Sequence, residues 1–387
     1  MNFLNVAFRE IKILQKNKFV LFCMLVMPFM FCLCLAVTFS SGSVYDLPVA
    51  VVDHDRSAFS RQIIRSLDAT SSIQVKYHLD DEKSAHDMLS SRKIYALLII
   101  PKNFNHDLKA LKRPSLSYYY NNQTMLIGGL LSKDLKTVLE GVKIKAYASV
   151  KSKSGITLKE ASNTVNLISQ SEHIHSNPYL NYSYFLVYIG IAHTFQVFCL
   201  LIGAWTFGFE FKYGSGPELF KTAEDSVLNA IAGKSVVYIG VLSLEIFLTV
   251  SLYILFGGAP FSGSMLFFML NTPLFVAACL SFAFILTVIF ANFRMVMSIV
   301  ACSASLGFTM TGGTFPSVAM PDAIRYLAAV FPVSSYASLL TGEAMQGHPS
   351  VCYLDSTIYL CLTILAGSLF YKLFYKRVQE PKLWHKL

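Results

Sequence analysis

Three short stretches contain residue types that could perform chemistry, but none completes a recognisable catalytic or metal site. Asp53-His-Asp55 and His173-Ile-His175 offer metal ligands, yet each lacks a third and a fourth ligand at a usable spacing. Ala232-Gly-Lys-Ser235 looks like the end of a phosphate-binding loop, but Leu228 occupies the position where that motif needs a glycine. No nucleophile with a neighbouring base and no paired carboxylates suggest catalysis. We therefore expect no catalytic residue and no metal site in this chain.

One acidic residue stands out because it lies inside an apolar segment. Glu245 interrupts the run Tyr238–Leu248, and a carboxylate at membrane depth is costly unless it faces water or a partner. It is therefore a candidate functional residue. Equally, it could be protonated, or it could pair with a hydroxyl group or with His193 inside a helix bundle. Coupled proton transport normally uses more than one such group, and Glu245 stands almost alone.

The composition predicts a membrane protein. Of 387 residues, 54% are hydrophobic and 14% are charged, with a mean hydropathy of +0.51, whereas a soluble domain is about one quarter charged. The net charge of +9 could suggest nucleic-acid binding, but basic residues at both ends of the chain flank apolar segments, as in membrane anchoring: Lys12, Lys16, Lys18, Lys372, Lys376, Arg377, Lys382 and Lys386. We expect membrane lipids around the chain and no nucleic-acid partner. Seven of the eight cysteines lie inside apolar runs, so we expect them to be packing residues.

Residues 1–18 predict an amphipathic helix on the cytoplasmic membrane surface. Arg9, Lys12 and Lys16 are expected on its polar face. The apolar residues recur at helical spacing on the other face: Phe3, Leu4, Ala7, Phe8, Ile11 and Leu14. Residues 19–40 then contain an uncharged run long enough to span a membrane. A cleaved signal peptide is the alternative, but this run is longer than the usual apolar core and no Ala-x-Ala site follows.

Residues 41–181 are polar and predict an extracytoplasmic α/β domain. Segments 47–52, 72–77, 94–100 and 115–120 have the composition of strands. Segments 57–67 and 81–92 predict helices, with Ser57 and Asp80 as N-caps. Residues 124–171 predict one or two long helices with a break near Gly155. We expect a binding or docking module rather than an enzyme.

Residues 182–375 contain five further apolar segments, which makes six predicted transmembrane helices. The predicted fold class is a polytopic α-helical membrane protein with an inserted extracytoplasmic α/β domain. With the amino terminus in the cytoplasm, the loop 208–234 and the basic tail 376–387 also fall inside, as the positive-inside rule requires. Residues 311–350 then lie outside. Their two apolar stretches are too short to cross, so we expect re-entrant or interfacial helices.

The loop 208–234 has two interpretations that the residues alone do not separate. It contains a glycine–proline break at Gly214–Pro217 followed by a short helix. It is either an ordinary connection between spans or a docking helix that presents Glu218, Leu219 and Phe220 to a cytoplasmic partner.

The order of these segments resembles the type-2 ATP-binding-cassette exporter permeases, in the branch with a large extracytoplasmic domain after the first span. Segments 47–57 and 95–104 resemble that branch's opening strand and its strand-Pro-x-x-Phe element. The cytoplasmic loop resembles the family's coupling helix, through Glu210, Gly214, Glu218, Leu219 and Phe220. Two outer segments resemble the Gly-x-x-Phe-Pro-x-x-x-Met-Pro and Pro-x-x-Tyr signatures, through Gly312, Phe315, Pro316, Met320, Pro321, Pro332 and Tyr336, although three residues rather than two separate Pro332 from Tyr336. The chain departs from the family in lacking a basic residue before Glu210 and an arginine shortly after Tyr336.

The resemblance implies a half-transporter in the bacterial cytoplasmic (inner) membrane. Two permease chains, identical or different, pair in the membrane, and cytoplasmic ATPase subunits dock on the loop and on the amino-terminal helix. These subunits bind ATP and Mg²⁺, and this chain has no cofactor of its own. Drugs, lipids and glycan precursors are substrates in the family, and periplasmic adaptor and outer-membrane proteins often take part. The segment 311–350 would be the outer gate of an export path or a structural plug against lipid headgroups.

Two other classes of function remain open at this point. A secondary transporter or channel would work without an ATPase and would depend strictly on Glu245 and on the membrane potential. A membrane-anchored receptor or scaffold would bind a ligand through residues 41–181. A membrane anchor needs fewer than six spans, so the receptor or scaffold is the least favoured of the three classes of function.

Overall fold

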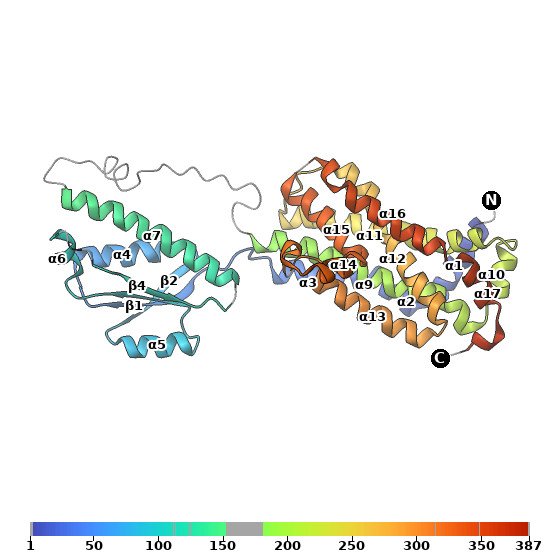
Figure 1. Ribbon diagram of the computed structural model, residues 1–387, viewed down its shortest axis with the longest axis horizontal. Helices are drawn as coiled ribbons and strands as arrows, with labels where there is room; N and C mark the ends of the chain where they lie inside the picture. Colours follow the sequence, from blue (N-terminus) through green and yellow to red (C-terminus); the bar gives the residue numbers. More distant parts are fainter. Residues whose placement is uncertain are drawn as a thin grey trace. The chain divides into compact units, whose positions relative to one another are not determined.

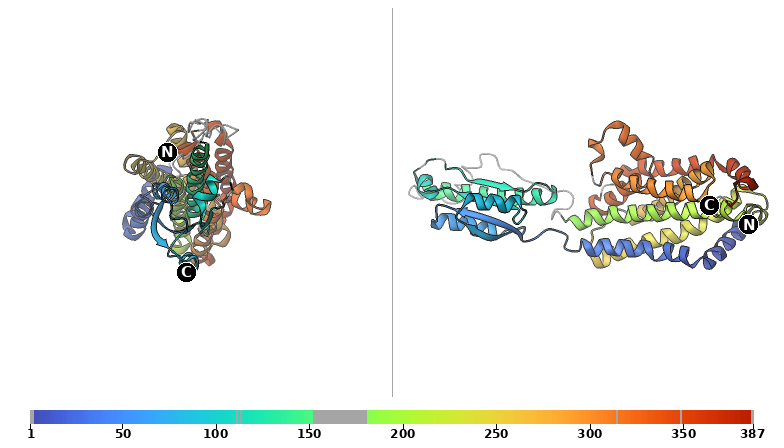
Figure 2. Two further views of the ribbon diagram at one scale, coloured as in Figure 1. Left: turned by 90° about the vertical axis from the view of Figure 1, so that its left-hand side faces the viewer. Right: turned by 90° about the horizontal axis from the view of Figure 1, so that it is seen from below.

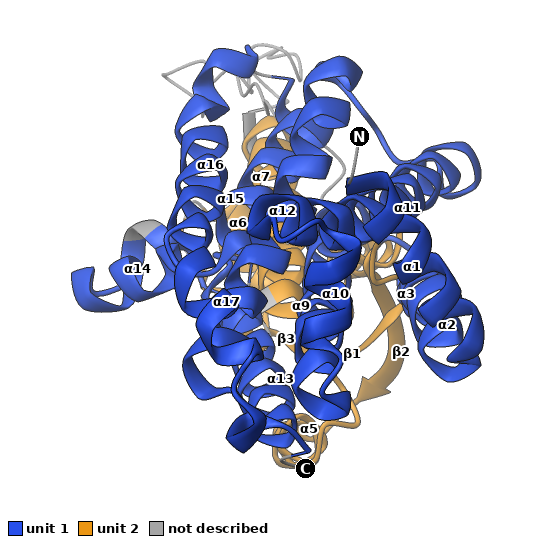
Figure 3. Ribbon diagram, turned by 90° about the vertical axis from the view of Figure 1, so that its right-hand side faces the viewer, with its two compact units in different colours: residues 1–42, 174–387 blue, residues 43–173 orange. Residues whose placement is uncertain are grey.

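The computed structural model describes residues 3–110, 112, 114–123, 125–151, 181–313, 315–347 and 349–385, and it divides into two compact units. Unit 1 comprises residues 1–42 and 174–387, and unit 2 comprises residues 43–173 (Figures 1 and 3). The predicted residues His173, His175 and Gly155 lie outside the described ranges. Within the described residues, six helical segments of unit 1 are long and apolar enough to cross a membrane, or seven if the bent pair Asp322–Ala329 and Pro332–Gln346 counts as one span, which confirms the predicted polytopic helical membrane protein.

Unit 2 is built on a four-stranded sheet with the strand order β2-β1-β3-β4. The strands are β1 (Leu47–Asp53), β2 (Ile73–Leu79), β3 (Ala96–Ile100) and β4 (Ser117–Tyr120). β1 pairs in parallel with both β2 and β3, and β4 runs antiparallel to β3. Because β1 and β3 are covered on both faces, they are apolar almost throughout rather than alternating.

Helices cover both faces of this sheet, as Figure 1 shows. One face packs on α4 (Ala58–Asp68) and α7 (Met125–Lys151), and the other packs on α5 (Glu82–Ser90). A short helix α6 (Phe104–Lys109) follows β3. Ser57 caps α4 as predicted, since its side chain accepts a hydrogen bond from the Ser60 amide. The cap of α5 is Asp81 and not the predicted Asp80, because Asp81 accepts from the amides of Lys83 and Ser84.

Unit 1 is a bundle arranged around α9 (Tyr182–Tyr213). In the most apolar stretch of α9, 67% of the residues are buried, against 17% in the first span. α9 contacts α3, α11, α12, α13 and α15, and the right panel of Figure 2 shows it between the other helices. The first span consists of α2 (Lys18–Leu25) and α3 (Met27–Thr38), and it follows α1 (Phe3–Lys16).

The remaining helices complete the bundle. They are α10 (Gly216–Thr222), α11 (Val227–Gly257), α12 (Met265–Phe290), α13 (Phe293–Met310), α14 (Asp322–Ala329), α15 (Pro332–Thr341), α16 (Leu354–Ser368) and α17 (Tyr371–Val378). A π-helical turn, Gly342–Gln346, extends α15, and short 3₁₀ turns lie at Ser317–Ala319, Ser350–Tyr353 and Pro381–Leu383. The pair α14 and α15 is bent by 90°, so the two short helices predicted between the last two spans are present.

The two ends of the chain meet at one end of unit 1. α1 packs on α11, and α17 packs on α11 and α12, so both ends of the chain lie beside α10 (Figures 1 and 2). Phe374 of α17 is fully buried there among other aromatic side chains, with ring centroids 5.2 Å from Phe284 and 6.2 Å from Phe211. Arg377 donates to the backbone oxygens of Val288 and Ile289, which places a cation at the carboxyl end of α12. We call this region the α1 end of the bundle.

Candidate functional site

A glycine allows α1 to lie directly on α11. A Cβ atom at Gly233 would come within 2.5 Å of the Phe3 carbonyl oxygen and 2.6 Å of the Val6 Cβ. Any side chain at this position would therefore force the two helices apart. The close approach brings one face of α1, with Val6, Glu10 and Leu14 buried, against the bundle.

Four charged side chains from α1, α9 and α11 meet at this contact. The Lys234 ammonium donates to Glu10 Oε1 and to Glu210 Oε1, both at 2.7 Å. Arg9 donates to both oxygens of Glu210, at 2.9 and 3.2 Å, and to Glu10 at 3.1 Å. Tyr238 donates to Glu10 Oε2 at 3.2 Å. We call Arg9, Glu10, Glu210 and Lys234 the buried charge cluster.

The cluster is electrically balanced and shielded from solvent. Two cations face two carboxylates, and the side chains of Glu10, Glu210 and Lys234 are at most 1% exposed. Burial by itself disfavours the charged guanidinium of Arg9, but the carboxylates of Glu210, Glu10 and Glu218 outweigh it, so the pKa of Arg9 is raised. Such a cluster is stable only while every member is present, because removing one leaves an uncompensated buried charge.

The cluster corrects the prediction for α1. Arg9 was expected on an exposed polar face, but its side chain is only 11% exposed and points to Glu210. Phe8 and Ile11, expected on the apolar face towards the membrane surface, are 62% and 38% exposed. The helix is amphipathic, but it is rotated so that Val6, Glu10 and Leu14 face the bundle, because the charges of Glu10 and Arg9 find partners there.

A groove of about 710 Å³ runs between α1 and α10, directly beside the cluster. The α1 side contributes Asn5, Phe8, Arg9, Lys12, Ile13, Lys16 and Asn17, and the other side contributes Phe209, Tyr213, Ser215, Glu218 and Thr222. Its wall contains exposed aromatic rings, Phe8 and Tyr213, beside charges of both signs. A surface with this mixture is suited to binding a segment of another protein.

The residues predicted for coupling fall into different environments around this groove. Glu210 belongs to the buried charge cluster and also accepts from Ser215 Oγ at 2.6 Å. Gly214 ends α9 in the left-handed conformation, φ +64°, which explains the glycine. Glu218 is 72% exposed and lies 3.9 Å from Arg9 Nε. Leu219 and Phe220 are fully buried in the chain's own core, so the expectation that α10 presents them to a partner is wrong.

The residues predicted for an outer gate do not form one exposed surface. Phe315 is 51% exposed, and Gly312 has a left-handed φ of +85°. Pro316 and Pro321 precede the helical turns that follow them, and Met320 is buried. Pro332 begins α15 and is buried. Tyr336 is in the bundle core, where its ring stacks on Phe275 at 4.0 Å and its hydroxyl lies 2.8 Å from Thr272 Oγ1. The role of this set in gating stays a prediction.

The two polar residues predicted inside the membrane do not pair. Neither carboxylate oxygen of Glu245 has a hydrogen-bond partner within the described ranges, although its side chain is only 8% exposed. His193 packs its ring 4.6 Å from that of Phe308 on α13, and its Nδ1 is also without a partner there. Of the alternatives considered for Glu245, pairing with a hydroxyl group or with His193 is therefore not found among the described residues.

Comparison with known proteins gives the family. The model of the ABC-2 family transporter proteins matches residues 18–370. This chain belongs to the ABC-2 transporter family. It is also 20% identical over 349 residues to the inner membrane transport permease YhhJ of Escherichia coli (strain K12) and to that of Shigella flexneri, with 89% of each chain covered. This ABC-2 protein is thus a multi-pass inner membrane permease subunit of an ATP-binding-cassette transporter, and it associates with ATPase subunits.

Sequence reasoning missed most of the buried charge cluster of this permease. It singled out Glu210 but not Arg9, Glu10, Lys234 or Tyr238 as site residues. One signal was present: Val6, Glu10 and Leu14 share a helical spacing of four, which places a carboxylate on a packed face. The partner could not be read from the sequence, because Lys234 lies 224 residues further along the chain.

Proposed function

We propose that this ABC-2 permease exports a small molecule, drug or lipid-like substrate across the inner membrane, driven by cytoplasmic ATPase subunits that dock in the groove between α1 and α10. The proposal places the α1 end, and with it both ends of the chain, in the cytoplasm. It places unit 2 on the outer side. A second permease chain completes the transporter, ATP and Mg²⁺ bind to the ATPase subunits, and a periplasmic adaptor and an outer-membrane protein are proposed further partners.

The observation that supports this proposal is the connection between the groove and the spans. Arg9 lines the groove and is also a member of the buried charge cluster. Through Glu210 and Lys234 the cluster joins α1 to α9 and α11, the second and third candidate spans. A displacement of α1 or α10 by a docked subunit therefore moves two spans as one body. ATP-driven closure of the subunits would be transmitted to the transport path by this route.

The test is a charge reversal at the exposed rim of the groove. Glu218→Arg and Phe8→Asp change exposed groove residues and leave the core intact. We expect both variants to fold, to retain less ATPase through purification and to lose ATP-dependent transport. Lys221→Glu is the matched control, because it reverses an exposed charge on α10 that does not line the groove. Leu219→Asp is unsuitable, since burial of that carboxylate would unfold the region.

Two outcomes would contradict the proposal. If the wild-type chain co-purifies with no ATPase and transports in its absence, it is a secondary transporter or channel. If the double variant Phe8→Asp/Glu218→Arg retains the ATPase and the transport of the wild type, the subunits dock elsewhere.

A further inference from the structure

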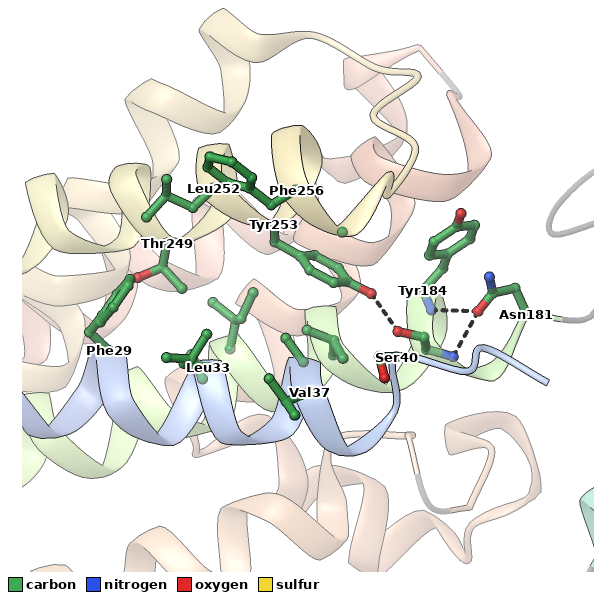
Figure 4. A pocket seen from close by; sticks show the side chains of 16 residues that line it. Phe29, Leu33, Val37, Ser40, Asn181, Tyr184, Thr249, Leu252, Tyr253 and Phe256 are labelled. Atoms are coloured by element: carbon green, nitrogen blue, oxygen red, sulfur yellow. Dashed lines mark hydrogen bonds between the residues drawn. The ribbon is translucent and has the colours of Figure 1, made fainter. Parts of the chain in front are cut away.

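A second cavity lies within the bundle, between the first three candidate spans. It has a volume of about 520 Å³ and is lined by residues of α3, α9 and α11, within the size range of small-molecule sites, roughly 300–1,000 Å³. Figure 4 shows Leu33 and Val37 of α3 opposite Leu252 and Phe256 of α11. The rim residues Leu33, Val37 and Phe256 are 46–85% exposed. These exposed rim side chains are apolar and belong to candidate spans, so the cavity opens onto the apolar surface of the bundle.

The cavity is polar at one end and apolar along its length. At the end near the connections to unit 2, Ser183 Oγ lies 2.9 Å from the Tyr253 hydroxyl, and Asn181 Oδ1 accepts from the Ser183 amide at 3.0 Å. Ser40 lies beside this group (Figure 4). Towards the α1 end, Phe29, Cys32 and Val187 make the wall apolar.

Glu245 lies on α11 one turn before the lining residue Thr249, and it is not itself part of the cavity lining. Thr249, one turn further along α11, lines the cavity and donates to the Glu245 carbonyl oxygen at 2.8 Å. The Glu245 carboxylate is also near enough to the lining Cys32 thiol to interact with it electrostatically. Its two oxygens are without a hydrogen-bond partner among the described residues, and its side chain is more than nine-tenths buried. A buried carboxylate without a partner is expected to receive one from outside the chain.

Among the described residues, no lysine or arginine is paired with this carboxylate. Every lysine and arginine in the six candidate spans lies within eight residues of a span end, so a second copy of the chain also has none at this depth. A metal ion is disfavoured, because no group of three or more histidine, cysteine or acidic residues occurs in the described ranges. The amine of a lipid headgroup is also disfavoured. To reach Glu245 from the end of α11 at Gly257, it would have to move twelve residues, about 18 Å, along the helix.

We propose that this cavity binds a lipophilic organic cation, with its positive charge at Glu245 and its apolar groups against α3 and α11. A delocalised charge enters a bilayer far more easily than a hydrated ammonium group. The aromatic rings of Phe29, Tyr253 and Phe256 supply apolar area and faces that attract cations. Binding of the cation does not depend on the proposed function. Only the further step, that the bound cation is the transported substrate, rests on it.

The experiment measures equilibrium binding of tetraphenylphosphonium to the full chain with its ATPase partner, in nanodiscs of phosphatidylcholine. We expect saturable binding by the wild type, and an affinity at least tenfold lower in Glu245→Gln, which keeps the size of the side chain and removes its charge. Triphenylphosphine oxide, which is neutral, should not compete. Leu248→Ala is the matched control, because this exposed residue of α11 does not line the cavity.

A second variant tests the cavity without changing Glu245. Ala36→Trp fills the space from α3 and should abolish saturable binding. If Glu245→Gln fails to fold, the Ala36→Trp variant by itself tests whether the cation binds in this cavity. Absence of saturable binding in the wild type, or wild-type affinity in either variant, would overturn the inference. Retention of the ATPase is recorded in the same samples. If the chain binds the cation but retains no ATPase, only the proposed function is contradicted. If the chain retains the ATPase but does not bind the cation, only this inference is contradicted.

Discussion

Two buried groups of charge in unit 1 are organised in opposite ways. At the α1 end, two carboxylates and two cations are hydrogen-bonded to one another, and each charged side chain has a partner, although Arg9 Nε makes no hydrogen bond among the described residues. Within α11, Glu245 is almost as deeply buried and has no partner among the described residues. A satisfied cluster fixes the positions of the helices that contribute to it. A lone carboxylate fixes nothing, and so it marks a place where a ligand can be bound. Two predictions test this contrast, and a third adds an exposed carboxylate in unit 2 for comparison.

The largest expected effect is a loss of stability when the cluster loses a cation. Lys234→Met keeps the length and apolar stem of the side chain but leaves Glu10 and Glu210 facing each other in the interior. Breaking a buried ion pair costs about 3–5 kcal/mol of the free energy of unfolding. We expect a clear fall in the thermal unfolding midpoint of the purified chain in detergent. Lys221→Met, at an exposed position, is the control. An unfolding midpoint equal to that of the wild type would show that the cluster does not hold α1 to α11.

A much smaller effect is expected at Glu245. Glu245→Gln replaces an unpartnered carboxyl group by an amide of the same size and opens no cavity, so the free energy of unfolding should change by less than about 1 kcal/mol. The same thermal measurement, made without tetraphenylphosphonium, reports it. A loss as large as that of Lys234→Met would mean that Glu245 has a structural partner, and the contrast between the two regions would fail.

The smallest effect is expected at an exposed carboxylate in unit 2. Hydrogen bonds from the Ser84 side chain, and from the amides of Ser84 and Lys83, lower the pKa of Asp81 at the amino end of α5. A carboxylate with a lowered pKa stabilises the folded state above its ordinary pKa, about 3.9, and this contribution is lost as the pH falls through the folded-state value. Hydrogen exchange of the Lys83 and Ser84 amides should therefore be faster in Asp81→Ala than in the wild type at pH 7. Equal exchange rates in the two proteins at pH 7 would contradict the assignment.

Local patterns in the sequence were enough to predict most of the elements. The strand β1 is a short apolar run bounded by turn residues, and Ser57 caps α4 because it directly precedes an amphipathic segment. The choice of Asp80 over Asp81 failed because both positions hold the same residue type, and only the backbone geometry separates them. The helices after Pro321 and Pro332 were predictable from the prolines and from their short length.

The candidate site was harder to predict because its contacts are long-range. Arg9 and Glu210 are 201 residues apart in the sequence. Because Arg9 is charged, the local helical pattern assigns it to the polar face of the amino-terminal helix and gives no sign of a buried partner. The side chains of Leu219 and Phe220 looked available to a partner because α10 is a short segment in a polar loop. They are buried because α17 returns to the same end of the bundle and places Phe374 and Tyr375 against Phe220. The resemblance to a family gave the function, but it did not give these contacts.

The buried charge cluster also sets the order in which the protein can be assembled. Glu10 is synthesised 224 residues before Lys234. At about 5–20 residues per second, translation takes roughly 10–45 s to cover that distance. During this interval α1 has left the ribosome, and the first two spans are complete, but half of the cluster's positive charge does not yet exist. α1 must therefore wait at the membrane surface and dock only when the third span is inserted. A nascent chain arrested before Lys234 would expose Glu10 and Glu210, which gives a cellular quality-control system a feature by which to recognise an unfinished permease.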